Sequence, residues 1–326
     1  MRSWVFLLIS VACAGCVFAG ALLIGNDYVF FAGYVVLQFI VLAQAWNILG
    51  GYTGYVNFGS AGFFALGAYT TVFFHKTLPL PVPVLMLIAG TVAGLGGLGM
   101  GYLALRLRGA FFSIATLALA VVLETLVVNW NYLGGARGAY VIRPESVWLI
   151  GSYVHYLFLM MLALAVVAIA TARGIERSRL GYGFAAIRDD ELAAEASGVP
   201  TLRLKLIAAT LSGVFMGMAG APFPYYIGYV QPAAAFGLEY AVNAIAMPMI
   251  GGTTSWVGPL IGAILVAGLQ QWASVSISSE LSLLVVGLLL VGFVIIAPGG
   301  ITGLVRSCVA AFTAAAAIRR KAAAVQ

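Results

Sequence analysis

Long, continuously apolar stretches dominate the sequence and restrict its fold more than any other feature. An apolar run of about 20 residues is long enough for an α-helix to cross the hydrocarbon core of a bilayer. Of the 326 residues, 63% are hydrophobic and only 8% are charged, whereas soluble domains carry about 25% charged residues. The runs do not alternate polar and apolar residues, as the strands of a transmembrane β-barrel would. We therefore predict an all-α integral membrane protein.

Ten apolar segments set the expected number of crossings. They lie at residues 4–24, 28–49, 55–75, 82–105, 110–130, 148–171, 204–222, 239–251, 257–274 and 281–297. We expect a polytopic bundle of 8–10 transmembrane helices, with ten as the preferred number. The two segments within 239–274 are short and are separated by a Gly-Gly-Thr-Thr-Ser sequence. They form either two extended crossings or a broken or re-entrant pair, whose irregular backbone must be shielded by protein or line a wet cavity.

The basic residues lie between the apolar segments and predict an orientation. Membrane proteins carry an excess of lysine and arginine in their cytoplasmic loops. With the N-terminus inside and ten crossings, thirteen basic residues fall on the cytoplasmic side, and only Lys76, Arg137 and Arg143 fall outside. Eight crossings with a re-entrant pair would give the same count. We therefore predict that both termini are cytoplasmic, and we attribute the net charge of +6 to topology and not to nucleic-acid binding.

The chain is predicted to form one transmembrane domain at 1–305, followed by a basic cytoplasmic tail at 306–326. Residues 1–24 are either a retained first helix or a cleaved signal segment, and we favour retention because cleavage would leave an odd number of crossings. The polar stretch at 173–203 interrupts the apolar segments and carries half of the ten acidic residues. It is too short for a domain but long enough for a cytoplasmic loop with one or two short helices.

Sequence motifs for catalysis and nucleotide binding are absent. A P-loop needs a lysine after a glycine, and none of the three lysines follows one. The sequence has neither a His-Glu zinc motif nor a Gly-x-Ser-x-Gly nucleophile elbow. Its three cysteines and two histidines have no metal-ligand spacing. We therefore predict that the chain has no catalytic residues, no metal site and no cofactor of its own.

A few polar residues inside the apolar segments are candidates for a solute path. Glu124 is the only acidic residue deep in such a segment, and an ionisable group there usually faces protein or water. It either lines a transport path or faces an aqueous vestibule. Uncharged polar groups in the same setting either line the path or hydrogen-bond between helices. The path candidates are Asn47, Asn57, Ser60, Thr116, Glu124 and Asn243.

Glycine-rich stretches predict a tight turn and close helix contacts. Residues 44–71 contain glycines that permit a turn at 50–54, followed by a phenylalanine-rich run. Small residues let membrane helices approach one another closely. The glycines assigned to packing are Gly50, Gly51, Gly54, Gly67, Gly251, Gly252, Gly258 and Gly262.

Several of these motifs resemble, in the same order, those of LivM-type permease subunits of branched-chain amino-acid ABC transporters. Leu133 stands where the family usually has a threonine, and the resemblance spans about residues 40–300. The matching stretches are 44–71 with its Gly67-Ala68-Tyr69-Thr70 ending, 108–117, Gly134-Gly135-Ala136-Arg137-Gly138, 188–198, and Gly251-Gly252 with Gly258-Pro259-Leu260-Ile261-Gly262.

The resemblance implies that the loop at 188–198 couples the chain to an ATPase. Ala193-Ala194-x-x-x-Gly198 is similar to the Glu-Ala-Ala…Gly coupling motif of ABC importers, with the glutamate displaced to Glu191 or Glu195. A short acidic helix ended by a glycine would seat in a groove of the ATPase and transmit its closure. The alternative is a solvated charged loop. The coupling candidates are Arg188, Asp189, Asp190, Glu191, Ala193, Ala194, Glu195 and Gly198.

The resemblance also implies a function, which is that of a permease subunit of an ATP-driven importer in the bacterial inner membrane. The implied partners are a second, LivH-type permease, two cytoplasmic ATPase subunits that bind ATP and Mg, and a periplasmic solute-binding protein. The implied cargo is branched-chain or other small hydrophobic amino acids, although relatives are assigned urea, amides or small organic acids. The alternative function is a stand-alone, ion-coupled secondary carrier that uses Glu124. A membrane-bound enzyme, the third alternative, would need a catalytic constellation that the sequence lacks.

Overall fold

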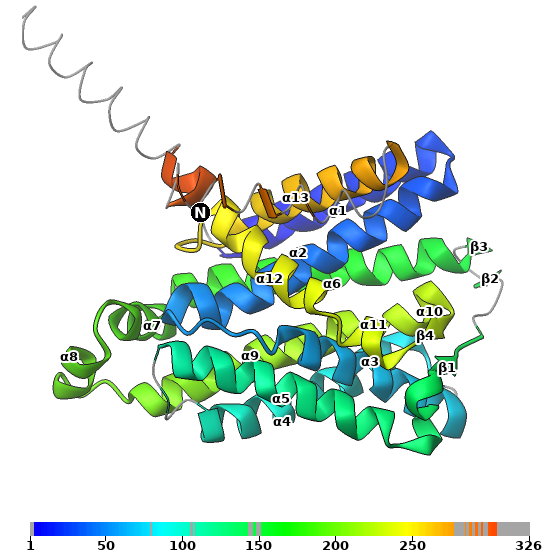
Figure 1. Ribbon diagram of the computed structural model, residues 1–326. Helices are drawn as coiled ribbons and strands as arrows, with labels where there is room; N and C mark the ends of the chain where they lie inside the picture. The colour runs from blue at the N-terminus through cyan, green and yellow to red at the C-terminus, as the bar shows by residue number, and fades with distance from the viewer. Residues whose placement is uncertain are drawn as a thin grey trace, which may run out of the picture.

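The protein is a bundle of long helices, with short strands at one end (Figure 1). The computed structural model describes residues 3–78, 80–104, 107, 109–142, 146–147, 151–276 and 299–304, together with positions 284, 287, 288, 291, 292 and 295. This architecture confirms the predicted all-α membrane fold. Within the described residues, eight stretches are long and apolar enough to cross a membrane. They are Trp4–Ile24, Asp27–Thr53, Val82–Ala104, Ala110–Val128, Tyr153–Glu176, Thr201–Ile227, Pro232–Gly251 and Val257–Val275.

The elements fall into long helices, short helices and two small strand pairs. The long helices are α1 (Ser3–Ile24), α2 (Asp27–Thr53), α3 (Ser60–Thr77), α4 (Val82–Ala104), α5 (Ala110–Val128), α6 (Tyr153–Glu176), α9 (Thr201–Gly220), α12 (Leu238–Gly251) and α13 (Val257–Ser276). The short helices are η1 (Asn131–Leu133), η2 (Gly135–Arg137), α7 (Arg179–Asp189), α8 (Glu191–Ala196), α10 (Phe223–Ile227) and α11 (Pro232–Ala235). The antiparallel pairs are β1 (Ala139–Tyr140) with β4 (Tyr229–Val230) and β2 (Ser146–Val147) with β3 (Gly151–Ser152).

Nine of the ten predicted segments coincide with long helices, although some boundaries differ. The predicted turn at 50–54 was placed too early, because α2 continues to Thr53 and ends at Gly54, whose φ of 78° is left-handed. The irregular stretch is therefore 54–59. α6 begins later than predicted, at Tyr153, because the Ser152 side chain caps it by accepting from the Val154 amide. Most of the predicted segment 281–297 lies outside the described residues, so the total of ten crossings stays a prediction.

The short pair predicted within 239–274 forms α12 and α13. The 14 residues of α12 span about 21 Å, which is less than the roughly 30 Å of a hydrocarbon core. The strand β4 and the short helix α11 precede α12, so this crossing is interrupted near Phe236. α12 runs towards the end of the bundle that carries α7 and α8, and α13 runs back (Figure 1). The structure thus favours a broken crossing over a re-entrant pair.

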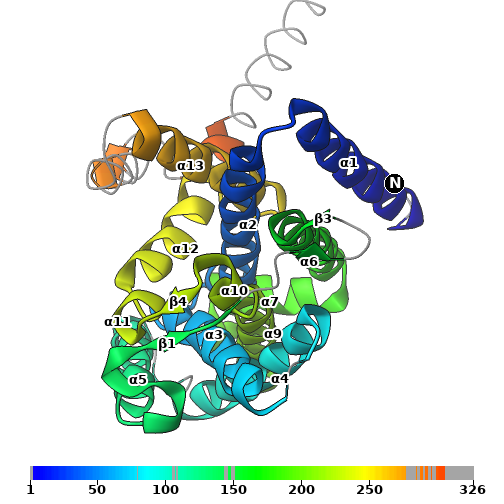
Figure 2. The same ribbon diagram turned by 90° about the vertical axis from the view of Figure 1, so that its right-hand side faces the viewer.

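Helix α2 is the centre of the bundle. Every residue from Leu37 to Thr53 is buried, because α2 contacts α6, α9, α12 and α13. Figure 2 shows α2 between α6 on one side and α12 and α13 on the other, with α1 at the edge. α1 packs mainly on α6 and leaves most of its side chains exposed. A helix that is apolar all round and exposed in this way fits contact with lipid.

Helices α4 and α9 make the most extensive helix pair, and glycines bring them together. A Cβ atom at Gly213 would lie 2.7 Å from the Ala93 carbonyl oxygen, and one at Gly217 would lie 2.6 Å from that of Ala89. The i, i+4 spacing of these two glycines is typical of close helix contacts in membranes. The sequence did not predict this pair, because Gly213 and Gly217 lie outside the glycine-rich motifs to which helix packing was assigned.

The eight glycines that were assigned to packing fall into three groups. Those that abut the main chain of a neighbouring helix are Gly67 against α9, and Gly251, Gly258 and Gly262 between α12 and α13. Gly50 and Gly51 lie inside α2. Gly50 packs against the Trp46 ring, and a Cβ atom at Gly51 would lie 2.9 Å from the Thr253 carbonyl oxygen. Gly54 and Gly252 end α2 and α12 with positive φ angles, so their role is in helix termination.

We expect Gly67→Ala to lower the free energy of unfolding by about 1–3 kcal/mol, because its methyl group would collide with the Gly217 carbonyl oxygen. A main-chain atom cannot rotate away from such a contact. The matched control is Gly99→Ala in α4, where an added Cβ meets nothing within 4 Å. This change should raise the free energy of unfolding by about 0.5–1 kcal/mol, because alanine loses less backbone entropy on folding than glycine. Equilibrium unfolding in mixed SDS micelles measures both variants, and equal effects would contradict this packing.

Candidate solute and coupling sites

A cavity of about 340 Å³ opens beside Glu124, at the interruption between α11 and α12. α5 forms one wall, the start of α3 forms the second, and the α11–α12 junction forms the third. Glu124 is the only charged residue among those that line it, and the other side chains are apolar. Small-solute sites commonly combine apolar walls with a few polar groups in this way. The lining residues are Phe58, Ala61, Leu117, Ala120, Val121, Glu124, Ala233, Phe236, Gly237, Leu238 and Ala241.

The Glu124 carboxylate is half-buried and open to this cavity. It makes neither a hydrogen bond nor an ion pair with any residue that the structure describes. Close by, Tyr69 is buried with no hydrogen-bond partner for its hydroxyl in that part of the chain, and its ring stacks on Phe236 at 6.2 Å. A carboxylate without a partner at membrane depth is costly, so it is available to a cation from outside the chain.

Three other path candidates gather where α3 begins against α5. Thr116 accepts a hydrogen bond from the Phe58 amide at 3.1 Å. Asn57 accepts one from the Gly59 amide at 2.7 Å, but its Nδ2 has no partner within the described chain, and neither has Ser60 Oγ. These groups flank Phe58 and Ala61, which line the cavity. Because an unsatisfied buried donor costs about 1–3 kcal/mol, water or a solute in this region would stabilise them.

The two remaining path candidates lie apart from the cavity and do not line it. Asn243 accepts a hydrogen bond from Gln270 Nε2 at 3.0 Å and so joins α12 to α13. Asn47 is fully buried in α2, and no described residue hydrogen-bonds its side-chain amide. Of the six candidates, therefore, only Glu124 lines the cavity. Asn57, Ser60 and Thr116 lie next to residues that line it, and Asn243 makes a contact between helices.

The coupling candidates lie on α7 and α8, which protrude from the end of the bundle opposite the strands (Figure 1). Asp190 caps α8, since its Oδ1 accepts from the Ala193 amide at 3.0 Å. Ala194 is buried and holds α8 to the bundle, whereas Ala193 is exposed. Gly198 follows α8 with a φ of 83°, so the chain can reverse there into α9.

The charged coupling candidates make contacts of two kinds. Arg188 and Asp189 form an ion pair of 3.5 Å at the surface, where such a pair contributes little to stability. Glu195 is exposed and accepts a hydrogen bond from Thr201 Oγ1 at 2.6 Å. Arg188 also packs against Gly54, where a Cβ would lie 3.3 Å from its Cγ. These contacts tie α7 and α8 to α9 and to the end of α2.

Glu191 is directed into the protein, where it forms a buried cluster with Lys205 and Tyr55 that we name the Lys205 triad. Lys205 Nζ lies 2.7 Å from Glu191 Oε1, and the two side chains are only 4% and 13% exposed. Nζ also donates to the Tyr55 hydroxyl at 3.2 Å, and that hydroxyl donates to Glu191 Oε2. The triad joins α8, the start of α9 and the irregular stretch 54–59. It therefore links the coupling region to the segment that leads into the cavity.

Sequence reasoning missed two members of this triad. Lys205 was counted only as one of the basic residues that set the orientation, although it is the second residue of a predicted apolar segment. A lysine at that place is a weak signal for a buried partner. Tyr55 gives no signal at all, because its partners Glu191 and Lys205 lie 136 and 150 residues away.

If the loop at 188–198 couples the chain to an ATPase, as the resemblance implies, we expect Gly198→Val to weaken that coupling, because a β-branched residue at positive φ is strained by about 1–3 kcal/mol. Gly198→Asn is the matched control, since asparagine tolerates the left-handed region and a Cβ there meets nothing within 4 Å. The measurement is solute transported per ATP hydrolysed. An equal loss in both variants would show that the side chain, and not the backbone conformation, matters.

Comparisons with known proteins identify the family of the chain. The profile of the family described as branched-chain amino acid transport system / permease component matches residues 28–294. LivM, a permease protein of the high-affinity branched-chain amino acid transport system of Escherichia coli K12, is 29% identical over 293 residues, which cover 82% of this chain and 68% of LivM.

More distant relatives belong to other import systems. LsrC, the autoinducer 2 import permease of Klebsiella pneumoniae, is 30% identical over 171 residues, which cover 49% of this chain and 48% of LsrC. RbsC, the ribose import permease of Escherichia coli K12, is 28% identical over 149 residues, which cover 44% of this chain and 40% of RbsC. No solved structure matches the chain. The protein therefore belongs to the family of branched-chain amino acid permease components, and it is a LivM-type, multi-pass ABC permease subunit.

Proposed function

We propose that this chain carries branched-chain or other small hydrophobic amino acids in an ATP-driven importer. The cavity beside Glu124 is the observation that carries the proposal. Its apolar walls suit an aliphatic side chain, because burial of apolar surface is favourable. Its single carboxylate suits an α-ammonium group, because hydrogen bonds between charged partners are about twice as strong as neutral ones.

The same cavity offers a position for the carboxylate of an amino acid. α12 begins at Leu238, and both Leu238 and its N-cap Gly237 line the cavity. The first amides of a helix have no partner inside it and attract anionic groups. In transporters, broken helices often direct such an end at a bound anion. Glu239, the acidic residue of the first turn, is exposed and does not line the cavity.

The charge of the cavity also separates the possible cargoes. An organic acid could bind at the start of α12 but would leave Glu124 without a cation, because no basic residue is among the described residues that line the cavity. Urea and simple amides carry no cation to pair with it. The ammonium group of a zwitterionic amino acid can pair with Glu124, and its carboxylate can bind at the start of α12. We therefore prefer an amino acid to an organic acid, urea or an amide as the cargo.

We further propose how the chain is assembled and oriented. A second, LivH-type permease would close the open side of the cavity. Two ATPase subunits, which bind ATP and Mg, would dock on α7 and α8 in the cytoplasm. A periplasmic binding protein would deliver solute at the end that carries β1 and β4, and both termini would be cytoplasmic. The basic residues around α7 and α8 support this orientation, since Arg173, Arg177, Arg179, Arg188, Arg203 and Lys205 lie at that end.

Movement of the ATPases would reach the cavity through the Lys205 triad. A displacement of α8 carries Glu191, which is bound to Lys205 and Tyr55. Tyr55 begins the stretch that continues through Asn57, whose carbonyl oxygen accepts a hydrogen bond from Trp46 Nε1 at 2.9 Å. Phe58 in the same stretch lines the cavity. The triad would therefore transmit the movement of α8 to one wall of the solute site.

Competition experiments test the cargo. Uptake of radiolabelled leucine by the assembled transporter should be inhibited by valine and isoleucine. It should not be inhibited by isocaproate, which lacks the ammonium group, by isopentylamine, which lacks the carboxylate, or by urea. Inhibition by isocaproate as strong as that by valine would refute the proposed amino-acid cargo.

A further inference from the structure

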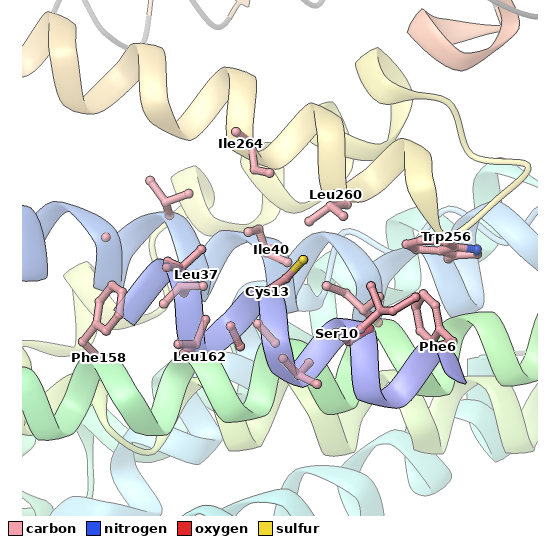
Figure 3. A pocket seen from close by; sticks show the side chains of 18 residues that line it. Phe6, Ser10, Cys13, Leu37, Ile40, Phe158, Leu162, Trp256, Leu260 and Ile264 are labelled. Carbon is pink, nitrogen blue, oxygen red and sulfur yellow. The ribbon is translucent and has the colours of Figure 1, made fainter. Parts of the chain in front are cut away.

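A second cavity, of about 570 Å³, lies between α1, α2, α6 and α13. Figure 3 shows its long shape, with Phe158 and Leu37 towards one end and Phe6 and Trp256 at the other. Of the described residues that line it, Ser10 is the only one with an aliphatic hydroxyl, and none is charged. Such a groove between membrane-spanning helices suits a hydrocarbon chain and offers a polar solute few hydrogen bonds.

The length of the groove corresponds to one leaflet of a bilayer. Along α6 the lining residues extend from Phe158 to Ile169, which is about 16 Å at the helical rise of 1.5 Å per residue. The hydrocarbon core of a bilayer is about 30 Å thick, so the groove spans about half of it. The groove ends beside the last turns of α6, close to the level at which lipid headgroups would lie.

A buried arginine marks this end of the groove. The Arg173 guanidinium lies 3.6 Å from the centre of the Phe6 ring, and Phe6 lines the groove. Arg173 is only 7% exposed, yet its Nη1 has no hydrogen-bond partner in the described part of the chain. Arg177 lies one turn further along and is exposed. The nearby Glu176 accepts a hydrogen bond from the Trp256 amide at 3.1 Å.

We propose that this groove holds an acyl chain of an anionic phospholipid, with the lipid phosphate bound by Arg173. The apolar lining accounts for the acyl chain, and the free Nη1 donor accounts for the anion. A guanidinium binds phosphate oxygens through several directed N–H groups. Basic residues at membrane surfaces favour anionic lipids over zwitterionic ones by a similar charge complementarity. This lipid site is independent of the solute that the chain transports.

Photo-crosslinking in vesicles tests the proposal. The full-length chain, assembled with its partner subunits, is placed in phosphatidylethanolamine vesicles with a trace of either phosphatidylglycerol or phosphatidylcholine that carries a diazirine on its acyl chain. Mass spectrometry then maps the crosslinked peptides. We expect phosphatidylglycerol to label the groove-lining parts of α1, α6 and α13 more strongly than the other lipid-facing helices.

Two variants separate the acyl chain from the headgroup. Cys13→Trp fills the middle of the groove (Figure 3) and should abolish groove labelling by both lipids, whereas the matched control Leu23→Trp, which is exposed on the same helix outside the groove, should not. Arg173→Gln should lower the preference for phosphatidylglycerol about fivefold. The exposed Arg179→Gln, whose residue does not line the groove, is its control.

Three results would contradict the proposal. Labelling spread evenly over all lipid-facing helices would show that the groove holds no particular lipid. Groove-lining peptides that stay unlabelled by both lipids, while the other lipid-facing helices are labelled, would show that a helix of a partner subunit fills the groove instead. An unchanged lipid preference in Arg173→Gln would refute the headgroup assignment.

Discussion

We expect Glu124→Gln to reduce the maximal rate of amino-acid uptake about ten- to hundredfold. Glutamine keeps the size of the side chain but removes the charge that we propose to pair with the solute's ammonium group. A hydrogen bond to a charged group contributes about 1.5–3 kcal/mol. Loss of that free energy would lower the fraction of cavities that hold solute about ten- to hundredfold, and the uptake rate with it. The half-saturating concentration should change little, because a binding protein that delivers the solute sets it. The measurement is the rate of leucine uptake into vesicles at saturating solute.

The controls for this variant are available in the same region. Glu124→Asp keeps the charge and should restore part of the rate. Glu239→Gln removes the exposed carboxylate in the first turn of α12, outside the cavity, and should leave uptake near the wild-type level. If Glu124→Gln transported leucine as fast as the wild type, the carboxylate would not bind the solute, and the cavity would be a vestibule.

The second large effect is expected from Lys205→Met, which removes the ion-pair partner of Glu191 in a buried setting. Both side chains are largely buried, at 4% and 13% exposed. Removing one partner of a buried ion pair destabilises a protein by about 3–5 kcal/mol. We expect unfolding of this variant at a lower SDS fraction than the wild type. Arg203→Met, which removes an exposed basic residue two positions earlier in α9, should have almost no effect.

A double variant separates stability from coupling. Lys205→Met combined with Glu191→Leu replaces the buried pair with apolar groups, and such replacements often restore stability. If the triad transmits the movement of α8, the transporter assembled with this stable double variant should still hydrolyse ATP on its ATPase subunits but transport less solute per ATP. A double variant with wild-type stability and wild-type coupling would mean that the triad only holds the fold together.

Hydropathy and charge made the fold predictable to a large extent. The apolar segments located α1, α4, α5, α9 and α13 to within a few residues, because lipid requires continuous apolar helices. The end of α2 was less predictable, since Gly50 and Gly51 are compatible with either a turn or a helix. The start of α6 depends on a cap at Ser152. The β1–β4 pair was not predicted, because two-residue strands leave no periodic pattern.

The candidate sites were predictable only where a charge stood out against apolar sequence. Glu124 was found in this way, and the family motif located α8. The cavity wall formed by Phe236 and Gly237 could not be foreseen, because it depends on the interruption of a crossing more than 100 residues away from Glu124. Likewise, the contact between Glu191 and Tyr55 arises from packing between segments distant in the sequence.

Reconstitution tests the central claim, that this chain is a permease subunit driven by ATPases, most directly. The chain is purified with its candidate permease, ATPase and binding-protein partners, and leucine uptake into vesicles is measured with and without ATP. We predict uptake that needs ATP and the binding protein, with none by this chain alone under an ion gradient. Uptake by the chain alone, driven by an ion gradient and indifferent to ATP, would contradict the claim and identify a secondary carrier.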